Sequence, residues 1–172
     1  MTNDQLRRIA PHAARRTIIN IYPLLIKYMT MYEINTYARI SAFLAQVIHE
    51  SGSFIYLHEI ASGAAYEGRK DLGNIYKGDG KKFKGRGLIQ ITGRSNYEQI
   101  SKATGIDFIG HPEWLEQLEY AVMSACWWWS SRNLNLLADN YMFTRITEII
   151  NGGHKGLKER KAIYLLAQKV LS

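Results

Sequence analysis

Apolar residues recur with the period of an α-helix over most of the chain. The clearest stretch runs from Thr36 to Glu50, where apolar residues at i, i+3, i+4, i+7 and i+8 line one helix face. These positions are Ile40, Phe43, Leu44, Val47 and Ile48. Ser51 and Gly52 follow and predict the helix end, because glycine readily adopts the left-handed backbone found there. We therefore expect Glu50 in the last turn of a core-packed helix.

The same period predicts further helices on both sides of this stretch. One or two helices are expected over residues 4–31, where Pro11 and Pro23 mark starts or kinks. The others are expected over Ser95–Ala103, Glu113–Arg132, Tyr141–Ile150 and Leu157–Leu171. Ser95 is the preferred amino-terminal cap of its helix, since its hydroxyl can accept a backbone N–H.

The period is lost between Gly52 and Gly87. Eight glycines fall in this segment, at positions 52, 63, 68, 73, 78, 80, 85 and 87, which is typical of turns and short strands. A strand is expected within Phe83–Ile91. The pattern as a whole predicts a mainly α protein, a helical bundle with a small Gly-rich lobe containing short strands.

Length and cysteine content narrow the class of protein. A chain of 172 residues fits one domain with a real core, so residues 1–172 are interpreted as a single catalytic domain without a separate cell-wall-binding domain. Cys126 is the only cysteine, which excludes an intramolecular disulfide and is typical of a packing residue in a reducing compartment. The first fourteen residues lack the apolar core of a signal peptide.

The formal charge of +7 predicts an acidic partner. Nucleic acid is one option, with the basic loop Lys81–Arg86 as its contact, although such charge runs are usually solvated. The closing segment Lys155–Ser172 is basic and amphipathic and is a candidate contact for an anionic envelope, although packing on the core is the commoner role. Its basic residues are expected on the face opposite the apolar stripe: Lys155, Lys158, Arg160, Lys161 and Lys169. A metal centre is not expected, because His49 and Glu50 lack the second histidine of the zincin motif.

Three features carry candidate chemistry. Glu50 and Glu59 are a carboxylate pair of the kind that glycosidic bond hydrolysis needs, one as acid and one to activate water. A polar cluster suited to sugar hydroxyl and N-acetyl groups follows the Gly-rich segment: Gln90, Thr92, Arg94, Asn96 and Tyr97. The third is Asn151-Gly152-Gly153, which by itself is more typical of a helix end.

Together these stretches resemble glycoside hydrolase family 19, which contains chitinases and many phage endolysins. The resemblance is carried by "FLAQVIHESGSF" (43–54), "EIASGAAYEGRKDLGN" (59–74), "GDGKKFKGRGLIQITGRSNY" (78–97) and "IINGG" (149–153). It covers nearly the whole chain and is greatest to the endolysin branch. It implies a lysozyme-like α+β fold and an inverting glycoside hydrolase that needs no cofactor.

The resemblance also assigns roles residue by residue. Glu50 in "HES" matches the general acid, Glu59 in "HEIAS" the general base, and Thr92 in "QITGR" the residue that helps to position the water. Gln90, Asn96, Tyr97 and Asn151 match residues that line the substrate cleft, and Arg160 matches an arginine that pairs with the catalytic carboxylates. Glu59 lies nine positions after Glu50, a shorter separation than in the chitinases, so Glu67 and Asp71 remain alternative bases.

The expected substrate is bacterial peptidoglycan, cut as by a muramidase for host-cell lysis, with chitin as the alternative. We expect a monomer that contacts glycan strands and no nucleic acid. Without a signal peptide, the protein is expected to be made in the host cytoplasm. It would reach the periplasmic wall through a separate holin-type pore.

Overall fold

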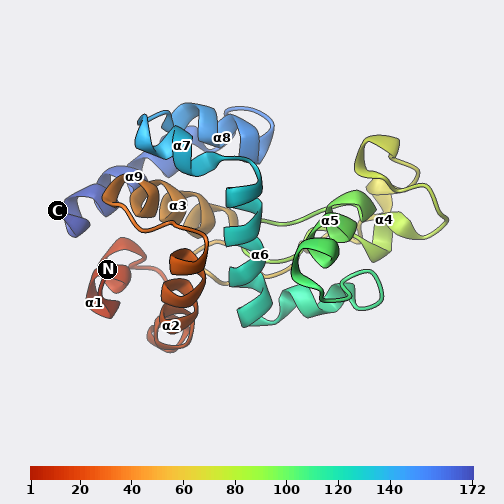
Figure 1. Cartoon of the computed structure of the whole chain (residues 1–172), viewed down its shortest axis with the longest axis horizontal. Coiled ribbons are helices and arrows are strands. Elements are labelled where there is room, and N and C mark those ends of the chain that lie inside the picture. Colours follow the sequence, from red (N-terminus) through yellow and green to blue (C-terminus); the bar gives the residue numbers. More distant parts are fainter.

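The computed structural model describes all residues from 1 to 172, and most of them are helical. Figure 1 shows α6 running between a larger helical part, which holds both termini, and a smaller lobe with α4 and α5. The larger part consists of α1 (Asn3–Ile9), α2 (Arg15–Met31), α3 (Tyr37–Glu50), α7 (Leu134–Asp139), α8 (Phe143–Asn151) and α9 (Leu157–Leu171). The central helix is α6 (Leu118–Ser131), and the smaller lobe holds α4 (Asp79–Lys82) and α5 (Arg94–Thr104). The expectation of a mainly α, lysozyme-like architecture is confirmed.

Helix α3 lies at the centre of the larger part and packs most extensively on α9. Ala38 and every residue from Ser41 to Ile48 are buried, so the helix is covered on nearly every side. Thr36 caps its start by accepting the Arg39 backbone N–H at 3.3 Å, and Ser51 ends it, as the pattern predicts. The rigid, enclosed helix fixes the position of Glu50 at its end.

Helix α6 joins the two parts because it is apolar around most of its circumference. Trp129 and Cys126 are fully buried, and the Trp129 ring meets Phe43 of α3 edge-on at 5.4 Å. Burial raises the pKa of the Cys126 thiol well above its ordinary value, consistent with a packing role. One continuous cluster of buried apolar side chains therefore extends from α1 across α6 to α9.

The smaller lobe is organised by ion pairs and turns in place of strands. Only single-residue bridges form, between His58 and Arg86 and between Arg86 and Ile91, so the strand expected within Phe83–Ile91 is reduced to isolated pairings. Two short 3-10 helices, η1 (Ala64–Tyr66) and η2 (Lys70–Leu72), precede α4. Buried Asp79 binds Arg94 through two hydrogen bonds of 2.6 and 2.8 Å, which fastens α4 to the start of α5.

The structure corrects three local predictions. The helix expected over Glu113–Arg132 is broken at Gln117, whose extended backbone separates the 3-10 turn η3 (Pro112–Glu116) from α6. Ser95 does not cap α5, because its hydroxyl donates to the Leu72 carbonyl. The backbone N–H of Arg94, at the start of α5, donates to Asn74 Oδ1 from the loop that follows η2. The periodicity also did not predict α7. No helix combines the length and apolar character needed to cross a bilayer.

Candidate active site

Glu50 and Arg160 form an ion pair between the carboxyl end of α3 and the first turns of α9. Arg160 Nη2 donates to Glu50 Oε1, and the Arg160 side chain is 2% exposed against 20% for Glu50. The sequence pattern placed Arg160 with the lysines on the polar face of its helix, and this placement is wrong. The structure instead shows Arg160 paired with Glu50, as the family resemblance implies.

Arg160 is held in place by a chain of hydrogen bonds behind the ion pair. Its Nη1 donates to Gln46 Oε1 at 2.6 Å, one turn before Glu50 on α3. Gln46 Nε2 donates in turn to Thr147 Oγ1 at 2.9 Å, and the Thr147 hydroxyl donates to the Phe143 carbonyl. Because Gln46 and Thr147 are fully buried, α3, α8 and α9 together fix the orientation of the guanidinium group.

Glu59 lies in the smaller lobe and is oriented by its neighbours. Its backbone N–H donates to the Gly85 carbonyl at 2.9 Å, and the Tyr66 hydroxyl donates to its Oε2 at 2.9 Å. Burial and the bond to Glu59 raise the pKa of the Tyr66 hydroxyl, so Tyr66 remains a donor. Glu59 Oε1 is buried and has no hydrogen-bond partner within the chain.

Gly85 brings Glu59 together with two members of the polar cluster. A Cβ placed on Gly85 would lie 3.0 Å from Glu59 Oε2, 3.0 Å from Gln90 Oε1 and 3.2 Å from Thr92 Oγ1. These three polar atoms therefore surround one glycine, and any side chain there would displace them. The Thr92 hydroxyl is further oriented by donating to the Gln90 carbonyl at 2.9 Å.

Gln90 has a left-handed backbone with a φ of 55°, although it is not a glycine. Such a conformation is held only where the surroundings enforce it, and it is concentrated at functional sites. Here the side-chain amide donates to the Gly87 carbonyl at 2.9 Å, which stabilises the turn from within. The turn presents Gln90 Oε1 to the same point as Glu59.

Asn96 and Tyr97 were both expected to line the cleft, but only Asn96 is accessible to solvent. Asn96 is partly exposed, and it bridges Thr92 and Arg132 by donating to the Thr92 carbonyl at 2.7 Å and accepting from Arg132 at 3.3 Å. Tyr97 is fully buried, and its hydroxyl is bonded to Arg86 and to the Lys84 carbonyl. The expectation that Tyr97 lines the site is wrong, because its ring fills the core of the smaller lobe.

Asn151 ends α8 and precedes the turn that leads to α9. Gly152 ends the helix with a φ of 73°, as the Asn-Gly-Gly motif predicts. The turn returns to α3 at Gly156, where an added Cβ would lie 2.4 Å from His49 Nε2. The loop from Asn151 to Gly156 therefore lies against the residue that precedes Glu50. Burial and the charge of Arg160 lower the pKa of His49, which favours a neutral ring.

The two alternative bases are engaged elsewhere. Glu67 accepts the backbone N–H groups of Gly78 and Gly80 at 2.7 and 2.9 Å, and these bonds lower its pKa. Asp71 is exposed and pairs with Arg69. Glu67 thus closes the turn before α4, and Glu59 is the carboxylate that lies beside Thr92. No three His, Cys, Asp or Glu side chains are grouped to hold a metal ion.

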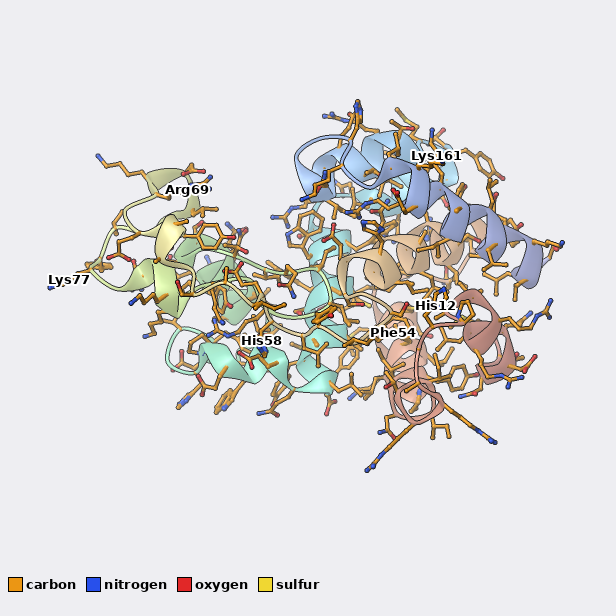
Figure 2. All side chains as sticks on the ribbon, turned by 180° about the vertical axis from the view of Figure 1, so that it is seen from behind. His12, Phe54, His58, Arg69, Lys77 and Lys161 are labelled. Carbon is orange, nitrogen blue, oxygen red and sulfur yellow. The ribbon has the colours of Figure 1, made fainter.

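Sequence reasoning missed the residues that orient the two carboxylates. Gln46 and Tyr66 were not singled out, although a buried amide one turn before Glu50 falls within the apolar face of α3 and was a detectable signal. Figure 2 shows Phe54 and His58 on the segment that leads from α3 into the smaller lobe and so connects the two halves of the site.

Comparisons with a family profile and with related sequences agree on one protein family. A profile described as chitinase class I, of glycoside hydrolase family 19, matches residues 25–140. A glycosyl hydrolase family 19 domain-containing protein of Haemophilus influenzae is 33% identical over an alignment 154 positions long, which covers 71% of this chain and 74% of that protein. An endochitinase of Arabidopsis thaliana is 36% identical over 116 residues, covering 66% of this chain but only 39% of the plant protein. The match thus spans well under half of the plant relative's length.

Solved structures share the fold. Chitinase C from Streptomyces griseus superposes with a TM-score of 0.77 at 21% identity, covering 99% of this chain and 76% of that one. A class IV chitinase from Zea mays gives a TM-score of 0.68 at 24% identity, covering 99% of this chain and 81% of that one. At these identities the likeness concerns the fold alone.

Proposed function

This chain belongs to glycoside hydrolase family 19, and from that premise we propose that it hydrolyses the β-1,4 glycosidic bonds of bacterial peptidoglycan by an inverting mechanism. The observation that carries the proposal is the fixed carboxylate pair. Glu50 is anchored by buried Arg160 at the end of α3, and Glu59 lies beside Thr92 and Gln90 in the smaller lobe. An inverting hydrolase needs two such carboxyl groups, about 6.5–9.5 Å apart, to admit one water.

Glu50 is the proposed general acid, which protonates the leaving glycosidic oxygen. Arg160 donates to Oε1, so this oxygen acts as an acceptor and the transferred proton resides on Oε2. The same bond fixes the rotation of the carboxyl group, since the guanidinium is itself held by Gln46. The acid is therefore oriented before substrate binds.

Glu59 is the proposed general base. Its Oε2 is bonded to Tyr66, while Oε1 is buried without a partner, a costly state for a carboxylate oxygen. The Glu59 Oε2 atom lies beside the Thr92 and Gln90 oxygens, so an attacking water that donates to the carboxylate on this side would pass its proton to Glu59 as the C–O bond forms. The nearby Thr92 and Gln90 oxygens would accept the water's second hydrogen or orient the sugar.

Charge favours peptidoglycan over chitin as the substrate. Both polymers contain β-1,4-linked N-acetylglucosamine, but peptidoglycan also carries lactyl and peptide carboxylates, which suit a chain of formal charge +7. Chitinase activity is the second candidate, because relatives and fold neighbours are described as chitinases. The proposed biological role is host-cell lysis by a phage endolysin that acts as a monomer on the wall, after release through a pore.

Digestion of purified sacculi and of colloidal chitin in parallel tests the proposal. Wild-type protein should release muropeptides whose mass spectra reveal the new reducing end: N-acetylmuramic acid for a muramidase, N-acetylglucosamine for a glucosaminidase. Glu50→Gln should lose more than about a thousandfold in rate, as expected for a lost general acid, while its far-UV circular dichroism spectrum should match that of the folded wild type. Exposed Glu113→Gln is the matched control and should retain wild-type activity. Clearance of chitin with no release from sacculi would refute the peptidoglycan assignment.

A further inference from the structure

A pocket lies on the outer side of the larger helical part, between the start of α8 and the exposed face of α9. Its volume is about 290 Å³. It is lined by Tyr141, Phe143, Thr144, Lys161, Tyr164 and Leu165. None of these residues belongs to the carboxylate site or to the hydrogen-bond chain behind Arg160, except that the Phe143 carbonyl anchors Thr147.

The pocket presents aromatic surface that the fold leaves open. Buried Phe143 stacks nearly parallel on Tyr164 with ring centres 4.3 Å apart, and so supports the Tyr164 ring as a flat aromatic wall of the pocket. Tyr141 stands beside them with 68% of its surface exposed, and Leu165 is 63% exposed. Exposed apolar residues gathered in one concave place are typical of a binding surface.

Tyr141 is also held in an unfavourable conformation. Its backbone φ is 55°, in the left-handed region that a bulky residue other than glycine rarely adopts. Such a conformation is unfavourable and tends to be kept at functional sites. Here it places the Tyr141 ring at the rim of the pocket.

Polar groups surround the aromatic wall without being used by the fold. The hydroxyl groups of Tyr141, Thr144 and Tyr164 and the ammonium group of Lys161 make no hydrogen bond or ion pair within the chain. A pyranose ring has two apolar C–H faces and a rim of hydroxyl groups. Flat aromatic surface edged by free donors and acceptors matches this shape and polarity.

The pocket is separate from the carboxylate site. It lies at the Phe143 end of α8, whereas Asn151 and the turn against His49 lie at the other end, about 12 Å away at 1.5 Å per residue. On α9, Arg160 points inward to Glu50 while the next residue, Lys161, is exposed. Figure 2 shows Lys161 on the outside of α9, in the opposite part of the molecule from Arg69 and Lys77.

We propose that this pocket is a second saccharide-binding site, which holds a strand of the wall polymer away from the catalytic carboxylates. The Tyr141 and Tyr164 rings receive the faces of an N-acetylated sugar, and Lys161 pairs with a lactyl or peptide carboxylate of peptidoglycan. This inference rests on the proposed function for the identity of its ligand. The site would keep the enzyme on an insoluble polymer between cleavage events.

Binding of inactive Glu50→Gln protein to purified sacculi tests this inference, since no cleavage then removes the ligand. Adding Tyr141→Ala should weaken binding about tenfold, the effect of losing one aromatic anchor. Adding Lys161→Gln should weaken it severalfold at low salt, with a smaller effect at high salt. Lys169→Gln removes the same charge from an exposed position farther along α9 and should bind like the parent.

With Glu50 intact, Tyr141→Ala should lower the ratio of activity on sacculi to activity on a soluble N-acetylglucosamine oligomer. A thermal midpoint equal to that of its parent protein would establish that each pocket variant folds. If the Glu50→Gln parent binds sacculi and both pocket variants bind equally well, this inference fails alone. If the parent does not bind sacculi at all, the proposed function fails together with it.

Discussion

Replacement of Arg160 by methionine tests the central geometry of the site. Methionine has nearly the length of arginine but no charge, so the change removes the bonds to Gln46 and Glu50 without opening a large cavity. Loss of one partner from a buried ion pair costs about 3–5 kcal/mol. Because the Glu50 side chain keeps 20% exposure and can be resolvated, we expect the lower end of this range, about 3 kcal/mol.

A loss of this size should lower the thermal midpoint by about 6–12 °C in a domain of this length. Urea unfolding followed by fluorescence of the buried Trp129 measures the free energy directly, and an unchanged slope with denaturant would establish that only stability changed. Hydrolysis should also fall, because Glu50 loses the bond that orients it. Arg160→Lys keeps the charge but cannot reach both partners, so it should lie between wild type and Arg160→Met.

A double-mutant cycle with Glu50→Gln separates the ion pair from general packing. The two changes should show a coupling energy above about 1 kcal/mol, since the residues are in direct contact. Additive effects within about 0.5 kcal/mol, or a loss of less than about 1 kcal/mol for Arg160→Met alone, would refute the argument that the pair is strongly coupled.

Three further predictions concern other parts of the structure. Tyr66→Phe removes the donor to Glu59 and should lower kcat about tenfold with little change in KM; equal kcat values for the two proteins would contradict the orienting role. The thiol of Cys126 should react with a disulfide reagent only as fast as the protein unfolds, because it is fully buried; rapid labelling of the folded protein would be inconsistent with this. The hydrogen bond from Arg94 lowers the pKa of Asp79, so its stabilising contribution should be full above its unfolded pKa of about 3.9 and lost as pH falls through the folded value. Asp79→Asn should therefore lose about 3 kcal/mol of stability at neutral pH, and its urea midpoint should fall less than that of wild type as the pH is lowered. An equal fall of the two midpoints with decreasing pH would refute this.

Local sequence predicted the bounds of α3, α5, α8 and α9 closely, and with them the place of Glu50. The Thr36 cap and the Ser51-Gly52 stop act within a few residues, so the pattern fixes α3 without knowledge of the remaining chain. The family motifs likewise predicted Glu59, Thr92 and Gln90 as site residues. Gly85 brings these three together in the structure.

The pattern failed where a distant partner decides the local conformation. The strand expected within Phe83–Ile91 is replaced by single pairings around Arg86, whose side chain binds Tyr97 and Glu116. Tyr97 was expected in the cleft because its neighbours are polar, yet its ring completes the lobe's core. Neither outcome can be derived from residues a few positions away.

The sequence by itself thus determined the helical class, the end of α3 and the set of motif residues, because these depend on short-range backbone preferences and on the period of apolar positions. Tertiary structure alone decided the role of Arg160, which the helical period places with exposed lysines. Its partner Glu50 is 110 residues away, and Gln46 and Thr147 are 101 residues apart. A buried guanidinium is stable only where all of these groups converge, and that convergence exists only after α3, α8 and α9 have packed together.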